Sequence, residues 1–70
     1  MRVIVNGKPR STGEEVEMPL LAFLAANDVD PKLVAVAING DVILKTAYSQ
    51  AVVREGDAIE IVRMVGGGAG

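Results

Sequence analysis

The chain has 70 residues, half of them apolar, with seven basic and nine acidic side chains and neither His nor Cys. This length allows one small domain, and the apolar fraction is enough for that domain to fold. The absence of His and Cys excludes disulfides, thiolate metal sites, cysteine nucleophiles and the usual general base. The net charge of −2, with a single Tyr and a single Phe, argues against binding to nucleic acid.

The ends of the chain show no targeting pattern. Met1-Arg2 is followed by only three apolar residues before Asn6-Gly7, which is too short for the apolar core of a secretory signal. Every apolar stretch is far below the ~20 residues that cross a membrane. We therefore expect a cytoplasmic protein with no membrane association.

The chain opens with a predicted β-hairpin. Residues 2–5 are rich in β-branched side chains, and Asn6-Gly7 suits a type I′ turn because both residues tolerate a positive φ. The return strand is expected within residues 9–18. The second half of that segment alternates polar and apolar side chains, which is typical of a half-buried strand.

A helix is predicted over residues 19–27. Pro19 suits the first helical turn, where a missing N–H costs nothing. Asn27 is expected to end the helix in a left-handed conformation, and Pro31 in the following turn prevents its continuation. Three side chains form the apolar stripe of this helix: Leu20, Phe23 and Leu24.

The next predicted elements are a second hairpin and an ambiguous segment. Residues 33–38 form a continuous apolar run before Asn39, which predicts a strand covered on both faces. Asn39-Gly40 repeats the turn chemistry, and residues 42–45 form the return strand. Residues 46–53 are ambiguous: Thr46 is a candidate cap for a short helical turn, and Tyr48 is expected to pack at the edge of the core.

The last predicted strand covers residues 58–65, after a turn at residues 55–57. Ile59 and Ile61, with Arg63, alternate with Glu60, Val62 and Met64. The first and last strands are the most apolar, so we expect them to be central, parallel neighbours. The resulting prediction is an α+β, β-grasp-like domain over residues 1–65. It has a mixed sheet of four to five strands, one main helix on one face, and a flexible glycine-rich tail over residues 66–70.

The acidic residues do not form a convincing site. Glu14, Glu15 and Glu17 are interpreted as a solvated surface, since no His or Cys completes a metal-ligand set. Asp28 and Asp30 resemble part of a calcium loop, but the other ligands are missing. Turn chemistry explains both aspartates better.

The glycine run at residues 66–68 is the most informative feature of the sequence. It is a poor phosphate cradle because no helix follows it. It could be a flexible linker. It could also thread into the active site of another enzyme, because it carries no side chains. A partner that adenylates the terminal carboxylate would make a mixed anhydride, which a sulfur nucleophile could attack.

Four segments together resemble the ThiS family of sulfur-carrier proteins in thiamine biosynthesis, over essentially the whole chain. Each segment alone is a weak signal, but their order and spacing before a glycine-rich end are fairly specific. They are residues 1–7 (MRVIVNG), 36–40 (VAING), 55–57 (EGD) and 59–68 (IEIVRMVGGG).

The resemblance implies a ubiquitin-like β-grasp fold and a role as a protein co-substrate, not an enzyme. It implies adenylation of the terminal glycine by a ThiF-like adenylyltransferase that uses ATP, while the chain itself binds no cofactor and no metal. Conversion to a thiocarboxylate would draw sulfur from a donor such as a cysteine desulfurase, and a ThiG-like thiazole synthase would receive it.

The same resemblance implies which residues act. Family members end at the diglycine, which places the reactive pair at Gly67 and Gly68. This sequence continues with Ala69-Gly70, so we expect a peptidase to remove these two residues; without trimming, Gly70 would be the reactive residue. The expected partner-contact residues directly precede the diglycine: Arg63, Met64, Val65 and Gly66.

Several alternatives stay open at this stage. Sulfur carriers for molybdopterin, such as MoaD-like proteins, and carriers for tRNA thiolation or amino-acid synthesis share the same design. A non-catalytic β-grasp binding module is a second class, and deleting the tail would inactivate a carrier but not such a module. Val62, Met64 and Val65 form either an apolar contact patch or part of the core.

Overall fold

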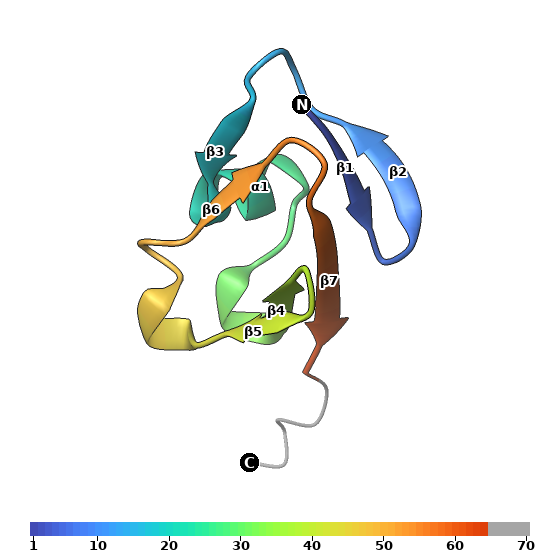
Figure 1. Ribbon diagram of the computed structural model, residues 1–70. Helices are drawn as coiled ribbons and strands as arrows, with labels where there is room; N and C mark the ends of the chain where they lie inside the picture. Colours follow the sequence, from blue (N-terminus) through green and yellow to red (C-terminus); the bar gives the residue numbers. More distant parts are fainter. Residues whose placement is uncertain (65–70) are drawn as a thin grey trace.

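The computed structural model describes residues 1–64 (Figure 1). Seven strands, one α-helix and two short 3₁₀ turns succeed each other along the chain. In chain order, these are β1 (Arg2–Val5), β2 (Lys8–Ser11), β3 (Glu17–Pro19), α1 (Leu20–Ala26), η1 (Pro31–Leu33), β4 (Val34–Ile38), β5 (Asp41–Ile43), η2 (Lys45–Ala47), β6 (Val52–Arg54) and β7 (Ala58–Arg63).

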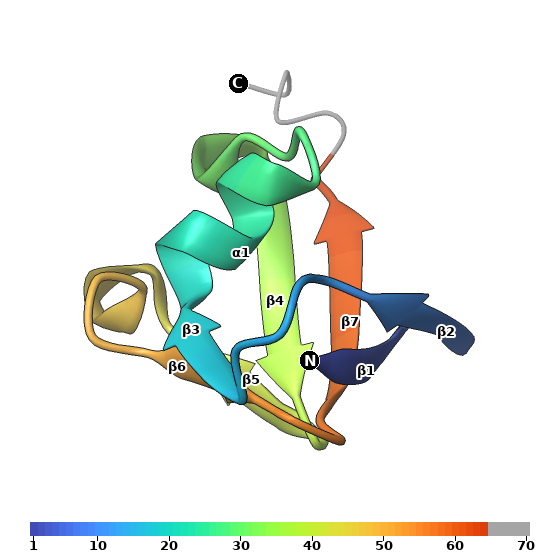
Figure 2. The ribbon, with the colours of Figure 1, turned by 90° about the horizontal axis from the view of Figure 1, so that it is seen from above.

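Five strands form one mixed sheet in the order β2-β1-β7-β4-β5. Strands β1 and β7 pair in parallel, whereas the other neighbours pair antiparallel. This confirms the prediction that the first and last strands are parallel neighbours. Helix α1 packs across one face of the sheet, in front of β4 in Figure 2. The α+β, β-grasp prediction is therefore confirmed.

Both predicted Asn-Gly hairpins form. Asn6 and Gly7 have φ values of 51° and 83°, and Asn39 and Gly40 have 52° and 87°. Two successive positive φ values are the mark of a type I′ turn, whose twist matches that of the strands it joins. The first return strand is β2, which pairs Val5 with Lys8. It is fully exposed at the sheet edge and ends at Ser11, so the return strand overlaps the first part of the predicted range of residues 9–18 and excludes its alternating second half.

That alternating segment instead contributes to a separate two-stranded sheet. Strand β3 pairs antiparallel with β6, with Met18 opposite Val53. The Leu20 N–H then donates to the Ala51 carbonyl at 2.8 Å. These bonds tie the start of α1 to the segment before β6, and Val53 is completely buried.

The helix buries its predicted stripe, but its ends differ from expectation. Pro19 is the N-cap, with φ −59° and ψ 143°, so it precedes the helix and is not in its first turn. Asn27 has φ −106°, and the left-handed residue is Asp28, with φ 58°. The Asn27 side chain explains the shift, because its amide nitrogen donates to the Phe23 carbonyl at 2.8 Å. The stripe residues with no exposed surface are Leu20, Phe23 and Leu24.

Strand β4 is covered on one face only, which corrects the expectation of a doubly buried strand. Val34 and Val36 are buried against the helix side, whereas Ala35 and Ala37 are half-buried. The apolar run was misleading because two of its members are alanines, whose small side chains can face solvent at little cost. The opposite face of the sheet is therefore open.

The ambiguous segment after β5 forms the 3₁₀ turn η2. Thr46 lies within this turn; its N-cap is Leu44, which makes no side-chain cap, so the prediction that Thr46 caps the turn was wrong. Tyr48 packs at the core edge as predicted and is 5% exposed. Its hydroxyl donates to the Val34 carbonyl at 3.1 Å, which joins this segment to β4.

Candidate functional site

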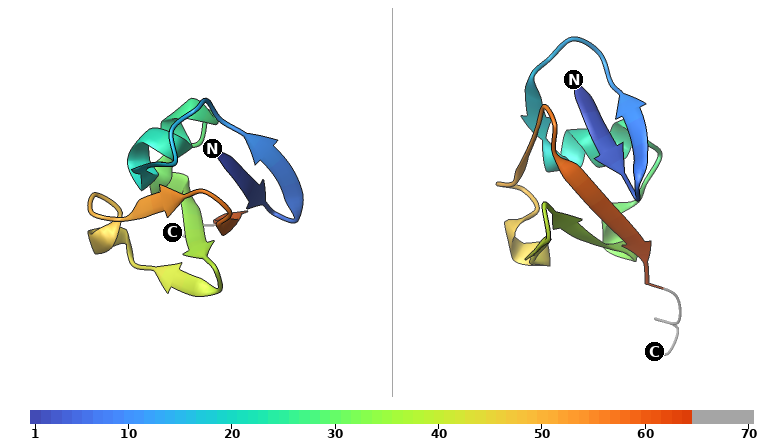
Figure 3. Two further views of the ribbon diagram at one scale, coloured as in Figure 1. Left: turned by 45° about the horizontal axis from the view of Figure 1, so that its top comes forward. Right: turned by 45° about the vertical axis from the view of Figure 1, so that its right-hand side comes forward.

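Strand β7 carries the chain from the centre of the sheet toward the glycine-rich residues. It lies between β1 and β4 and runs the length of the sheet (Figure 3). Its register pairs Arg63 with Val34, and the Met64 N–H donates to the Leu33 carbonyl at 2.8 Å. The described chain is thus held to β4 as far as Met64.

The two asparagines of the hairpin turns both bind the region of β7. The Ile61 N–H donates to Asn6 Oδ1 at 2.8 Å, and Asn6 Nδ2 donates to the Ile61 carbonyl at 3.2 Å. Asn39 Oδ1 accepts from the Ala58 N–H at 2.9 Å, and Asn39 Nδ2 donates to Asp57 Oδ1 at 3.0 Å. These side-chain hydrogen bonds add to the backbone hydrogen bonds that pair β7 with β1 and β4.

The open face of the sheet is apolar around the end of β7. Val62 is 62% exposed and Met64 is 45% exposed, so both side chains face solvent. This resolves the alternative left by the sequence: they belong to a surface patch and not to the core. On the neighbouring strands, Val62 pairs with Ala35, and Ala37 pairs with Val42, which is also exposed.

We call this surface the open-face patch. Single exposed apolar residues are ordinary, but a contiguous group of them marks a surface used for protein contacts. Sequence reasoning identified the β7 members and missed those on and after β5. The alternation of the strand was available as a signal, but it does not tell which face the helix leaves open. The members are Ala35, Ala37, Val42, Leu44, Val62 and Met64.

Arg63, predicted to contact a partner, is exposed at the end of β7. It shares its face of β7 with the core-side residues Ile59 and Ile61, so it lies on the helix side of the sheet and not on the open face. Within residues 1–64, the single ion pair joins Arg54 Nε and Glu17 Oε1 at 3.4 Å, between two exposed side chains. The charge of Arg63 is therefore available to a partner.

The remaining predicted site residues lie outside the described part of the chain. They are Val65 and Gly66, expected to contact partners, and the reactive Gly67 and Gly68, with Gly70 as the untrimmed alternative. The predicted boundary between a domain over residues 1–65 and a tail over residues 66–70 also lies outside the described residues.

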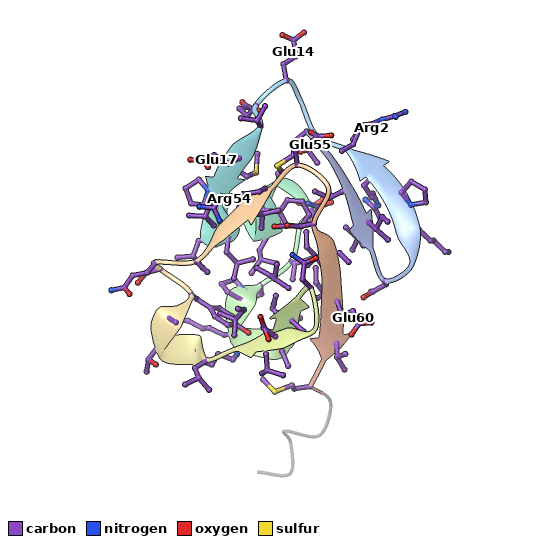
Figure 4. All side chains as sticks on the ribbon, viewed as in Figure 1. Arg2, Glu14, Glu17, Arg54, Glu55 and Glu60 are labelled. Atoms are coloured by element: carbon purple, nitrogen blue, oxygen red, sulfur yellow. The ribbon has the colours of Figure 1, made fainter. Side chains whose placement is uncertain are left out.

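The acidic residues serve local structure where the structure describes their role. Asp30 Oδ1 accepts from the Lys32 N–H at 2.8 Å, so it caps the turn η1, as turn chemistry predicts. Glu17 belongs to the surface ion pair with Arg54, which lies on the paired strands β3 and β6 (Figure 4). Across residues 1–64, no group of three or more acidic side chains gathers in a metal-binding arrangement. In that same range, no helix is long and apolar enough to cross a membrane.

A mixed five-stranded sheet with one helix across it, and an open face beside its central strand, defines a β-grasp domain. Comparisons with known proteins identify its family. The ThiS family matches residues 3–68. The chain therefore belongs to the ThiS family and is a thiamine biosynthesis protein of that family.

Solved structures of a relative agree with this assignment. The crystal structure of the thiamine biosynthesis protein ThiS from Geobacter metallireducens is 31% identical in sequence and superposes with a TM-score of 0.85. The match covers 94% of this chain and 97% of that one. A solution NMR structure of a thiamine biosynthesis protein from the same organism is 32% identical, with a TM-score of 0.76, and the match covers 89% and 81%.

A curated relative is much longer. The protein named thiazole synthase from Paramagnetospirillum magneticum is 36% identical over 69 residues. The match covers 99% of this chain and 21% of that protein. This chain therefore spans about a fifth of that relative's length.

Proposed function

We propose that this chain is a sulfur carrier for the formation of the thiazole ring of thiamine. Gly68 is its reactive residue. The observation that carries this assignment is that the family match ends at residue 68, at the last glycine of the run after β7. A peptidase that cleaves after Gly68 removes Ala69-Gly70 and frees the Gly68 carboxylate.

The carboxylate needs activation because it is a poor electrophile. In the proposed reaction, a ThiF-like adenylyltransferase joins it to the AMP portion of ATP, and pyrophosphate leaves. The terminal sulfur of a persulfide on a donor such as a cysteine desulfurase then attacks the acyl carbon, and AMP leaves. A thiol cleaves the resulting acyl disulfide, which releases the glycine thiocarboxylate and leaves the donor sulfur in a disulfide with that thiol. Residues 66–68 carry no side chains, which suits passage through a narrow channel to the partner's active site.

The carrier provides the surface that the partner binds, and the partner provides the catalytic groups. The open-face patch includes Met64, the last described residue before the proposed reactive glycine. A partner that covers this patch gains affinity by burying apolar surface and receives the glycines in a fixed direction. Arg63, exposed at the end of β7 on the helix side of the sheet, offers a charge contact to an acidic group on that partner.

A ThiG-like thiazole synthase is the proposed acceptor of the sulfur. The curated relative supports this partner, because its name is thiazole synthase and it contains a segment 36% identical to this chain. Two proteins that act in succession benefit from covalent linkage, since it raises their effective concentration.

The test compares Gly68→Val with a chain truncated after Gly68, using a ThiF-like adenylyltransferase and ATP. The truncated chain should support exchange of pyrophosphate into ATP, and the Gly68→Val form of the same truncated chain should not. Both should have the same circular dichroism spectrum, because the change lies beyond the packed strands. Normal exchange by Gly68→Val would overturn the assignment of Gly68.

A further inference from the structure

One charged side chain interrupts the apolar part of the open sheet face. Glu60 lies on β7 between Ala58 and Val62 and is exposed. Its side chain points away from the body of the domain in Figure 4. Across the sheet, Glu60 is opposite Ala37 on β4, and Ala37 is opposite Val42 on β5. The carboxylate therefore borders the open-face patch directly.

Glu60 has no cationic partner within the chain. The salt bridge between Arg54 and Glu17 is the single one among residues 1–64. Residues 65–70 are Val, Gly, Gly, Gly, Ala and Gly, none of which carries a cationic side chain. On β1, the parallel register continues from the pair of Val5 and Ile59 to place Asn6 at the level of Glu60. The Asn6 amide is already bonded to Ile61.

A protein that covers the patch must therefore replace the hydration that this carboxylate loses. Taking an unpaired carboxylate out of water is costly, and the cost is offset when a cation with well-placed donors meets it. A guanidinium suits this role best, because its planar fork bonds both carboxylate oxygens and is weakly hydrated.

A second copy of this chain is a poor occupant of the face. Among the described residues, the cation that a second copy offers on this face is Arg2, which shares the side of β1 occupied by Ile4. Suppose that two copies stack face to face in antiparallel orientation, with Arg2 of each copy opposite Glu60 of the other. The centre of the contact then lies at the paired residues Ile4 and Ala58.

That register would leave the far end of the patch uncovered. Val62 and Leu44 lie beyond Glu60, on the side away from Ala58. In the pairing with Arg2, they would extend past the end of the other sheet. A second copy thus satisfies the carboxylate or covers the apolar residues, but not both.

On this basis, and resting on the proposed function, we propose that Glu60 pairs with an arginine of the adenylating partner. That arginine is set in an apolar surface that covers Ala37, Val42 and Val62. The pair sets the register of docking, so that the chain after Met64 is directed into the partner's active site. The apolar contacts supply affinity, and the charge pair supplies specificity.

The experiment measures the affinity of a ThiF-like adenylyltransferase for the chain truncated after Gly68, which serves as the parent, and for three variants of it over a range of salt concentrations. Glu60→Gln should weaken binding by about tenfold or more, since it leaves the partner's arginine buried without a charge. Glu60→Lys should weaken binding further. The control is Glu14→Lys, which makes the same charge change on the loop before β3, far from Glu60 in Figure 4, and should bind like the parent chain.

Salt separates a charge pair from a merely structural role. Added salt should weaken binding of the parent chain, have little effect on Glu60→Gln, and strengthen binding of Glu60→Lys, because salt screens both attraction and repulsion. Equal affinity of the parent and Glu60→Lys, with normal adenylation of both, would overturn this inference and leave the proposed function intact. A parent chain that is neither bound nor adenylated would overturn both. Sedimentation of the parent chain as a dimer that Glu60→Lys dissociates would assign the face to a second copy.

Discussion

The side-chain amide of Asn6 bonds both backbone polar groups of Ile61. The Ile61 N–H donates to Oδ1 at 2.8 Å, and Nδ2 donates to the Ile61 carbonyl at 3.2 Å. Strand β1 ends at Val5, where the chain turns away from β7. The amide therefore continues the parallel pairing after the backbone has left it. Asn39 acts in a similar way at the start of β7, through the Ala58 N–H. A turn residue in each hairpin thus helps to hold β7, the strand that leads to the glycines proposed to react.

Replacing Asn6 by Gly should destabilise the domain by about 1–2 kcal/mol, because it removes two side-chain hydrogen bonds. Glycine tolerates the φ of 51° at this position, so the turn itself should persist. Asn6→Asp keeps the acceptor and loses the donor, and its stability should be intermediate. Urea denaturation measures all three proteins. An unchanged midpoint for Asn6→Gly would show that the amide does not hold β7.

Val62→Asp should abolish adenylation without unfolding the domain. Val62 is 62% exposed, so the substitution leaves the core intact but places a carboxylate in the surface proposed to be buried against the partner. The measurement is pyrophosphate exchange at a fixed concentration of adenylyltransferase, with each substitution made in the chain truncated after Gly68. Val16→Asp is the matched control, since Val16 is 69% exposed and precedes β3. Equal loss in both variants, or loss in neither, would argue against the open-face patch as the docking surface.

Tyr48→Phe should lower stability by about 1–2 kcal/mol, because it removes a buried hydroxyl that donates to the Val34 carbonyl and leaves that carbonyl without this bond. The ring and its packing are kept. Thermal unfolding should show a lower midpoint, while adenylation at low temperature should be unchanged, because Tyr48 lies in the core and not on the open face. A variant as stable as the parent would mean that the bond contributes nothing net.

Local sequence signals predicted much of the fold. Each Asn-Gly pair identified a hairpin because few residues accept two positive φ values in succession. The spacing of Leu20, Phe23 and Leu24 identified the buried face of the helix. The apolar character of the first and last strands identified their parallel pairing.

The features that the sequence could not predict depend on long-range packing. Strand β2 has no apolar alternation because it is an exposed edge strand. Strands β3 and β6 are three residues each, and their pairing depends on contacts between distant parts of the chain. The alternation of β7 separated Val62 and Met64 from Ile59 and Ile61, but only the position of the helix decides which set faces solvent. The sequence did not show that Glu60 borders an apolar surface, because this depends on the pairing that places Ala37 and Val42 beside it.

The intact mass of the protein isolated from its native cells, grown without added thiamine, tests the central claim most directly. We expect a chain that ends at Gly68, with a fraction in which one oxygen is replaced by sulfur. A thiocarboxylate on Gly70 would keep the carrier role and overturn the trimming. A chain that ends uniformly at Gly70 with an ordinary carboxylate, in cells that are making thiamine, would contradict the proposed function.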